Sequence, residues 1–170
     1  MDVFEAVKTR RSTRKFKDST IEKEKLSKVL EAARFAPSAA NLQPWSFIVV
    51  SDKTIRQSLF SGYSRQWFVD APIIIVACGF PDKGWCRKDG EKYYPLDVAI
   101  AMQNLILAAH DVGLGTCWIA AFDEKKVKKA LDIPKNVRVI AMTPLGYPDE
   151  VKGPVTERKS FEEMIHYNKW

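Results

Sequence analysis

A basic run near the N-terminus carries the residue types that bind phosphate. Three arginines stand beside two hydroxyl side chains in the order Arg10-Arg11-Ser12-Thr13-Arg14. Guanidinium and hydroxyl donors form charge-assisted hydrogen bonds with an anion, each contributing about 1.5–3 kcal/mol. The run lies between two segments with helical periodicity, so packed elements would hold it in place. These residues alone leave two alternatives open, a phosphate-binding loop and an ordinary exposed basic turn.

A polar turn over residues 37–44 offers a second set of binding groups. Ser38, Asn41 and Gln43 supply hydroxyl and amide groups, and a proline at each end stiffens the backbone that presents them. Such a turn suits the recognition of a heteroaromatic ring. The alternative is a loop that only ends the preceding helix and begins the following strand.

Hydrophobic periodicity predicts the elements around these two segments. Val3, Phe4 and Val7 share one face of a first helix. A second helix is expected to begin near Ser19 and Glu22, which have capping-box spacing, and to end before residue 37. Further helices are predicted over residues 53–60, 96–112 and 124–131, and strands over 45–50, 72–77, 116–122 and 137–145. The fold class is therefore α+β, with strand 72–77 covered on both faces and helix 96–112 buried at the centre.

Length, charge and hydropathy limit the classes of protein. A chain of 170 residues, 46% of them hydrophobic, can bury one core without a second domain. The net charge of +6 suits nucleic acid, an anionic membrane or anionic cofactors without choosing among them. Most lysines alternate with apolar residues at helical spacing, which indicates solvated helix faces. We expect a cytoplasmic protein, because no signal peptide is evident and the longest apolar run, residues 71–80, is too short to span a bilayer.

Several common sites are not predicted. The three cysteines are odd in number and far apart, which indicates free thiols, and the two histidines lack neighbouring ligands for a metal. Gly79 and Gly84 have the spacing of a phosphate-binding P-loop, but Trp85 stands where its lysine belongs. The glycines of Gly113–Gly115 follow a helix rather than a strand and lack the third glycine of a dinucleotide fingerprint. No dedicated nicotinamide or ATP domain is therefore expected.

Four ordered motifs resemble the FMN-dependent nitroreductase family. They are the basic run continued to Phe16, the segment Pro-Ser-Ala-Ala-Asn-Leu-Gln-Pro-Trp at 37–45, the segment 113–122, and the strand end at 145–148 with Arg158 and Lys159 beyond it. The resemblance covers essentially the whole chain, as a single nitroreductase-like domain. It implies a central, mostly antiparallel sheet flanked by helices, and a homodimer in which both chains build each of two FMN sites at the interface.

The resemblance also implies which residues bind the cofactor. Arg10, Ser12 and Arg158 would lie at the flavin phosphate, with Lys159 as a helper. Arg14 would lie near the ring, where a cation stabilises the negative charge of the reduced flavin. The backbone N–H of Ala120 would donate to flavin N5. The full implied set is Arg10, Arg11, Ser12, Arg14, Pro37, Ser38, Ala39, Asn41, Gln66, Trp118, Ile119, Ala120, Ala121, Arg158 and Lys159.

Two departures from longer family members bear on these roles. Longer members often have glutamate and glycine where this chain has Ala120 and Ala121, so a side-chain role is lost there while the backbone role remains. The chain is also short, and the polar loop 81–94 is all that remains as a candidate lid. The tail 153–170 is expected to reach the partner subunit, which would contribute residues 37–41 to the site.

The implied activity is ping-pong transfer of an electron pair from NADH or NADPH, through flavin N5, to a small acceptor such as a nitroaromatic or a quinone. The flavin does the redox chemistry, so no protein nucleophile or general acid is expected. The alternatives are a relative with another reaction, such as dehalogenation or flavin fragmentation, a flavin carrier without turnover, and a basic nucleic-acid-binding domain. The last would be colourless and would bind DNA or RNA with a strong dependence on salt.

Overall fold

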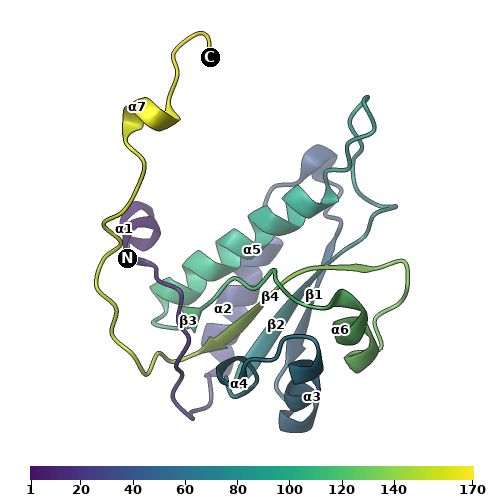
Figure 1. The fold of residues 1–170 in the computed structure, drawn as a ribbon, viewed down its shortest axis with the longest axis vertical. Helices are drawn as coiled ribbons and strands as arrows, with labels where there is room; N and C mark the ends of the chain where they lie inside the picture. The colour runs from purple at the N-terminus through teal and green to yellow at the C-terminus, as the bar shows by residue number, and fades with distance from the viewer.

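A four-stranded antiparallel sheet lies at the centre of the computed structural model, which describes residues 1–170 (Figure 1). The strands follow the order β1-β2-β4-β3, with every pairing antiparallel. Their bounds are Trp45–Val50 for β1, Ile73–Gly79 for β2, Gly115–Thr116 for β3 and Arg138–Gly146 for β4. The predicted α+β class and antiparallel sheet are confirmed.

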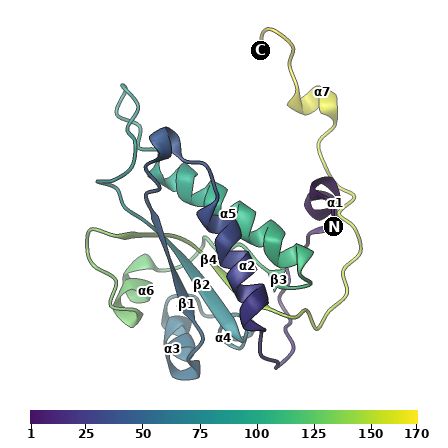
Figure 2. The same ribbon diagram turned by 180° about the vertical axis from the view of Figure 1, so that it is seen from behind.

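Helices cover both faces of this sheet. In Figure 2, α2 and α5 cross one face, while α3, α4 and α6 lie at the other. The helices are α1 Val3–Thr9, α2 Lys23–Arg34, α3 Lys53–Ser58, α4 Gln66–Val69, α5 Tyr94–Asp111, α6 Glu124–Ala130 and α7 Phe161–Met164, with 3₁₀ turns η1 Ala39–Asn41 and η2 Leu59–Ser61. Each predicted helix is present, and the short α4 and α7 were not predicted because a single turn carries too little periodicity.

Strand β2 divides the core into two halves. Its side chains alternate, so Ile73 and Ile75 pack under α2 and α5, while Ile74 and Val76 pack under α3, α4 and α6. All seven of its residues are buried. The predicted burial on both faces is confirmed. Burial also raises the pKa of the Cys78 thiol to about 11, so that this thiol stays neutral at physiological pH.

Two helices carry exposed apolar side chains. Helix α5 was predicted to be buried all round, but Leu96 is 47% exposed and Ile100 41%. Only α2 and the sheet cover this helix in depth, so its remaining face is open. On α1, Val3 and Phe4 are each 77% exposed. Val3 and Phe4 lie on the helix that precedes the basic run, whereas Leu96 and Ile100 lie on the first turns of α5.

Two local predictions need correction. The capping box at Ser19 and Glu22 does not form: Glu22 is the N-cap of α2 without a side-chain cap bond, because its carboxylate accepts the hydroxyl proton of Tyr147 instead. The predicted strand 116–122 ends after Thr116. The backbone N–H of Cys117 donates to Thr143 Oγ1 at 3.1 Å, which interrupts the regular ladder until Ile119 pairs with Met142 in an isolated bridge.

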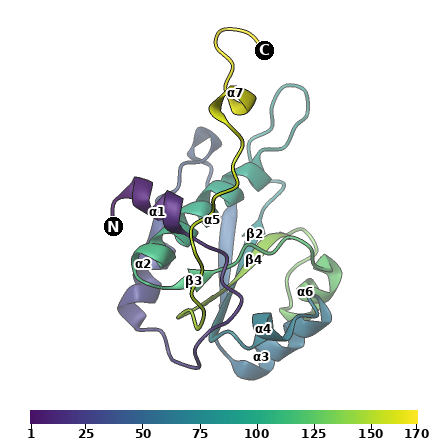
Figure 3. The same cartoon turned by 60° about the vertical axis from the view of Figure 1, so that its left-hand side comes forward.

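Two segments project from the body. Loop 81–94 forms a narrow hairpin, in which the backbones of Cys86 and Lys92 pair in an isolated antiparallel β-bridge. The rings of Trp85 and Tyr93 meet edge to face, with centroids 4.9 Å apart. Helix α7 and the C-terminus stand clear of the sheet in the views of Figures 1 and 3. No helix combines the length and apolar character needed to cross a bilayer.

Candidate functional site

The backbone of the basic run pairs with β3 at the edge of the sheet. Ser12 pairs with Thr116 in a parallel bridge, and the backbone N–H of Thr13 donates to the carbonyl of Thr116 at 2.8 Å. Thr13 is only 6% exposed. Gly115 permits this approach, because a Cβ at Gly115 would lie 2.6 Å from Thr13 Oγ1. The loop that carries the arginines is therefore fixed to β3 by backbone pairing.

The arginines of this loop have no acidic partners. Arg10 and Arg11 line a pocket of about 400 Å³ with Thr13, His110 and Lys152, among other residues. The guanidinium groups of Arg10, Arg11 and Arg14 form no ion pair, although nine ion pairs occur elsewhere in the chain. Unpaired cations on a fixed loop are available for an anionic ligand.

Glu150, the acidic group in the pocket, is already bound. Its Oε1 accepts from the backbone N–H of Arg14 at 2.5 Å and lies 3.0 Å from Lys152 Nζ. Burial opposes its ionisation, yet these two donors hold the pKa of Glu150 below its usual range. Lys152 in turn donates to the carbonyl of Ser12 at 2.6 Å. Glu150 and Lys152 therefore hold the loop against the segment after β4. Because their charges offset each other, the unpaired positive charge in this region belongs to the arginines.

His110 adds an uncharged side chain to the lining of the pocket. Its Nε2 lies 2.8 Å from Thr9 Oγ1, and the Thr9 hydroxyl donates to the carbonyl of Glu5 at 2.7 Å. Because the only hydroxyl proton goes to Glu5, His110 must be the donor to Thr9. Burial is the larger cause that lowers the pKa of His110, and the positive charge of Arg10 is the second. The ring is therefore neutral near pH 7 and carries its proton on Nε2.

The polar turn 37–43 is held in a strained conformation. Ala40, Asn41 and Gln43 have φ angles of 51°, 54° and 48°, in the left-handed region that L-residues rarely adopt. Asp97 anchors the turn, since its Oδ1 accepts from the backbone N–H of Ala39 at 3.0 Å. Ser38 Oγ closes it by accepting from the backbone N–H of Gln43 at 2.9 Å. Strain maintained by a buried carboxylate points to a functional turn.

Asp97 itself is an unexpected buried group. It is 2% exposed, and its Oδ2 is the one buried side-chain oxygen in the chain without a hydrogen-bond partner. A charged residue within the apolar pattern of 96–112 was visible in the sequence, but no pattern indicated that it would meet Ala39. His110 and Lys152 were missed for the same reason, because their contacts with the basic run join distant parts of the chain.

The basic run and the polar turn lie at opposite ends of α5. Asp97 holds the turn at the first turns of this helix, whereas His110 faces the basic run at its last turn. An 18-residue helix spans about 27 Å. In Figure 1, α1 and the chain that follows it lie at the lower left end of α5, whereas the chain that follows α2 reaches its upper right end. One chain therefore does not bring Arg10 and Ser12 together with residues 37–41.

Segment 118–121 forms the third part of the candidate site. Ile119 is fixed to Met142 by two backbone hydrogen bonds of 2.9 and 3.0 Å. The backbone N–H groups of Ala120 and Ala121 donate no hydrogen bond within the chain. Both alanines line a second pocket, of about 540 Å³, whose other walls are residues 62–65 and 122–123. The predicted donor at Ala120 is thus free in the structure.

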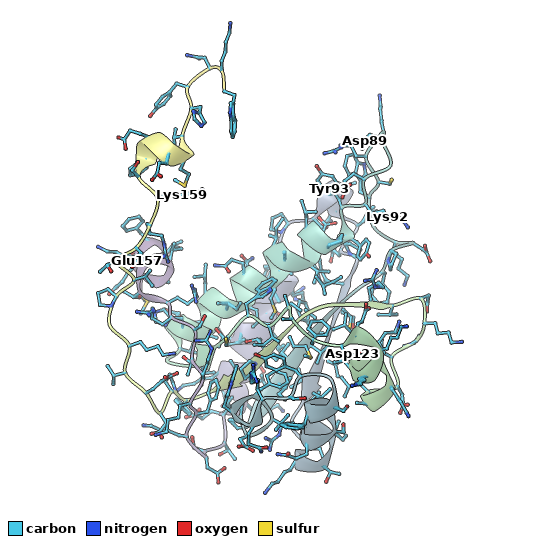
Figure 4. All side chains as sticks on the ribbon, in the orientation of Figure 1. Asp89, Lys92, Tyr93, Asp123, Glu157 and Lys159 are labelled. Carbon is cyan, nitrogen blue, oxygen red and sulfur yellow. The ribbon has the colours of Figure 1, made fainter.

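The remaining predicted residues lie apart from the basic run. Gln66 begins α4, next to the second pocket, and its Nε2 donates to Asp70 Oδ1 at 2.7 Å. Arg158 and Lys159 are exposed on the C-terminal tail, where Arg158 donates only to the adjacent carbonyl of Glu157. Figure 4 places Lys159 beside α7, far from the sheet. Within one chain, the tail does not join the pocket of Arg10.

Comparison with known proteins gives the class to which this arrangement belongs. The pattern that defines the Nitroreductase family matches residues 7–61 and 57–147. A protein of Methanothermobacter thermautotrophicus, named as an NADH dehydrogenase/NAD(P)H nitroreductase, is 36% identical over all of this chain and 88% of its own length. The chain belongs to the nitroreductase family.

Solved structures agree with that assignment. A nitroreductase family protein of Clostridium difficile 630 superposes with a TM-score of 0.92 at 31% identity, over all of both chains. An FMN-dependent nitroreductase of Clostridium difficile R20291 superposes with a TM-score of 0.85 at 32% identity, over 99% of this chain and all of the other. The family resemblance and the fold expected from it are confirmed.

Proposed function

We propose that this chain is an FMN-dependent oxidoreductase that passes electron pairs from NADH or NADPH to a small acceptor. The observation that carries the proposal is the basic loop paired with β3. Its three arginines have no acidic partner, and two of them, Arg10 and Arg11, line a pocket. A flavin phosphate supplies the missing negative charge. The names of the relatives, which refer to NAD(P)H and FMN, support the same activity.

The residues present fit this cofactor. Arg10 and Ser12 would bind its phosphate, and Arg14, whose guanidinium is free, would lie near the ring as a cation. The unpaired N–H of Ala120 would donate to flavin N5. When bound, the flavin supplies the redox chemistry, accepting an electron pair from NAD(P)H and passing it to the acceptor. The chain supplies charge, hydrogen bonds and orientation.

A homodimer would complete each site. Asp97, which holds the turn 37–41, and His110, which contacts Thr9 beside the basic run, are about 20 Å apart along α5. A second chain is therefore the natural source of that turn. The exposed apolar residues of α1 and α5 supply a surface for such contact. In this arrangement Pro37, Ser38, Ala39 and Asn41 of one chain meet Arg10 of the other, and the tail 153–170 with Arg158 and Lys159 crosses to the partner.

Two further parts of the proposal concern access and location. The hairpin 81–94 is a candidate lid, and its small size would leave an open site that accepts nitroaromatics or quinones. The three free cysteines suit a reducing compartment, so we place the enzyme in the cytoplasm. The chain is proposed to act as one FMN-binding domain over residues 1–170.

Anaerobic absorbance spectroscopy tests the activity directly. The FMN-loaded protein is expected to lose its yellow absorbance band within seconds after addition of NADH or NADPH, and to regain it on addition of a nitroaromatic or quinone. Bound flavin that stays oxidised would instead identify a carrier, and failure to bind FMN would refute the proposal. Free FMN with the same nucleotide is the control for reduction without protein.

Asp97 is expected to affect flavin binding through the turn alone. Replacing it by alanine removes the acceptor for the Ala39 N–H and frees the strained turn, which is expected to raise the Kd for FMN about fivefold. Asp97→Asn keeps one acceptor oxygen and should stay closer to the parent value. Fluorescence titration with FMN measures both. Equal loss in the two variants would show that charge, and not the turn anchor, is what Asp97 contributes.

A further inference from the structure

The pocket between residues 62–65 and 120–123 contains unpaired hydrogen-bond donors. The backbone N–H groups of Ala120 and Ala121 donate to no group in the chain, and neither does the N–H of Ser64. The Tyr63 hydroxyl and the Arg65 guanidinium also make no hydrogen bond or ion pair, although both residues line the pocket. The surplus of donors is the opposite of what a cationic ligand requires.

The one carboxylate in this pocket is already bound. Asp123 Oδ1 caps α6 by accepting from the backbone N–H of Lys126 at 3.1 Å. Its Oδ2 lies 3.8 Å from Lys126 Nζ, which offsets its charge. Figure 4 shows Asp123 at the start of α6. Arg65 therefore provides the uncompensated charge of the pocket.

The walls of the pocket are rigid. The ring of Tyr63 meets those of Trp67 and Phe68 edge to face, with centroids 6.1 and 5.2 Å apart. Gly62 accepts from the backbone N–H of Asp123 at 2.9 Å, and a Cβ at Gly62 would lie 2.7 Å from a Val127 methyl group. These contacts fix the two walls relative to each other. A volume of about 540 Å³ accommodates an aromatic ligand.

We propose that this pocket binds an aromatic ligand carrying a carboxylate or phosphate group, with Arg65 as the residue that binds the anion. The inference rests on the proposed function, which places the reactive edge of the flavin at Ala120, beside the same pocket. The Tyr63 hydroxyl adds a neutral donor on the same wall as Arg65. The oxyanion has two sources, a carboxylate on the electron acceptor and a phosphate of NAD(P)H, and each makes a different prediction.

The test uses the FMN-loaded protein, Arg65→Gln and two acceptors of matched shape, 4-nitrobenzoate and 4-nitrobenzamide. With an acceptor carboxylate as the source, the variant is expected to raise the KM for 4-nitrobenzoate about tenfold and to leave 4-nitrobenzamide within about twofold. With a nucleotide phosphate as the source, both acceptors are unaffected, and the NADPH concentration for half-maximal rate of flavin reduction rises instead. Either result supports an oxyanion site at Arg65.

Lys125→Gln is the matched control, because Lys125 is exposed on α6, does not line the pocket, and carries the same charge. An equal effect of the two variants would show long-range attraction and overturn the proposal, as would an equal rise in KM for both acceptors, or no effect of Arg65→Gln on any ligand. Arg65→Lys should restore part of the affinity. Failure of the parent protein to bind FMN, or to be reduced by NAD(P)H, would refute the proposed function before any acceptor is added.

Discussion

An Arg10→Gln variant is expected to bind FMN about 10- to 100-fold more weakly than the parent protein. Arg10 lines the 400 Å³ pocket, lacks an acidic partner and lies on a loop fixed to β3. A charge-assisted bond of about 1.5–3 kcal/mol therefore goes to the ligand without first breaking an internal ion pair. Titration of the apoprotein with FMN, followed by flavin fluorescence, measures the change.

The control for this variant is Lys53→Gln, which removes the same charge from the exposed start of α3. It should leave the Kd for FMN within about twofold, because a solvent-exposed charge far from the ligand is screened at physiological salt. The parent should also lose affinity as salt rises, more steeply than Arg10→Gln. A Kd for Arg10→Gln equal to that of the parent would remove Arg10 from the phosphate site, provided that its thermal unfolding is unchanged.

Much of the fold follows from local patterns in the sequence. Strand β2 was predicted as covered on both faces because it has no polar residue, and its alternating side chains fill two separate cores. Helix α5 was predicted at nearly its observed bounds for similar reasons. Because α5 is apolar on nearly every side, its sequence did not indicate which face is buried and which is exposed in one chain. Leu96 and Ile100 are exposed in one chain, and the proposed homodimer would offer a surface to cover them.

The site was less predictable than the fold. Arg10, Ser12 and the turn 37–41 could be proposed as candidates because their residue types cluster in short segments. The groups that hold them come from far along the chain: Lys152 contacts Ser12 across 140 residues, and Asp97 contacts Ala39 across 58. Such contacts depend on tertiary packing, which no spacing rule describes. Positive φ angles at Ala40 and Asn41 were equally invisible, since neither glycine nor a turn dipeptide marks them.

Mixing two variants that each bind FMN weakly is expected to restore tight FMN binding to some sites if each site is built by two chains. Arg10→Gln damages the basic run, and Asn41→Asp places a negative charge on the turn while keeping a residue that tolerates a left-handed backbone. Each homodimer then carries the same defect in both of its sites. A heterodimer carries both defects in one site and none in the other.

The expected recovery follows from that symmetry. If the two chains are unfolded together in equal amounts and refolded, half of the dimers are mixed, so about a quarter of all sites should bind FMN with the parent affinity. Titration with FMN would then show a tight phase that neither variant shows alone. If each site were built within one chain, every chain would keep its own defect and no tight phase would appear. The separation of the two segments along α5 favours the first outcome, because about 20 Å of helix lies between Asp97 and His110.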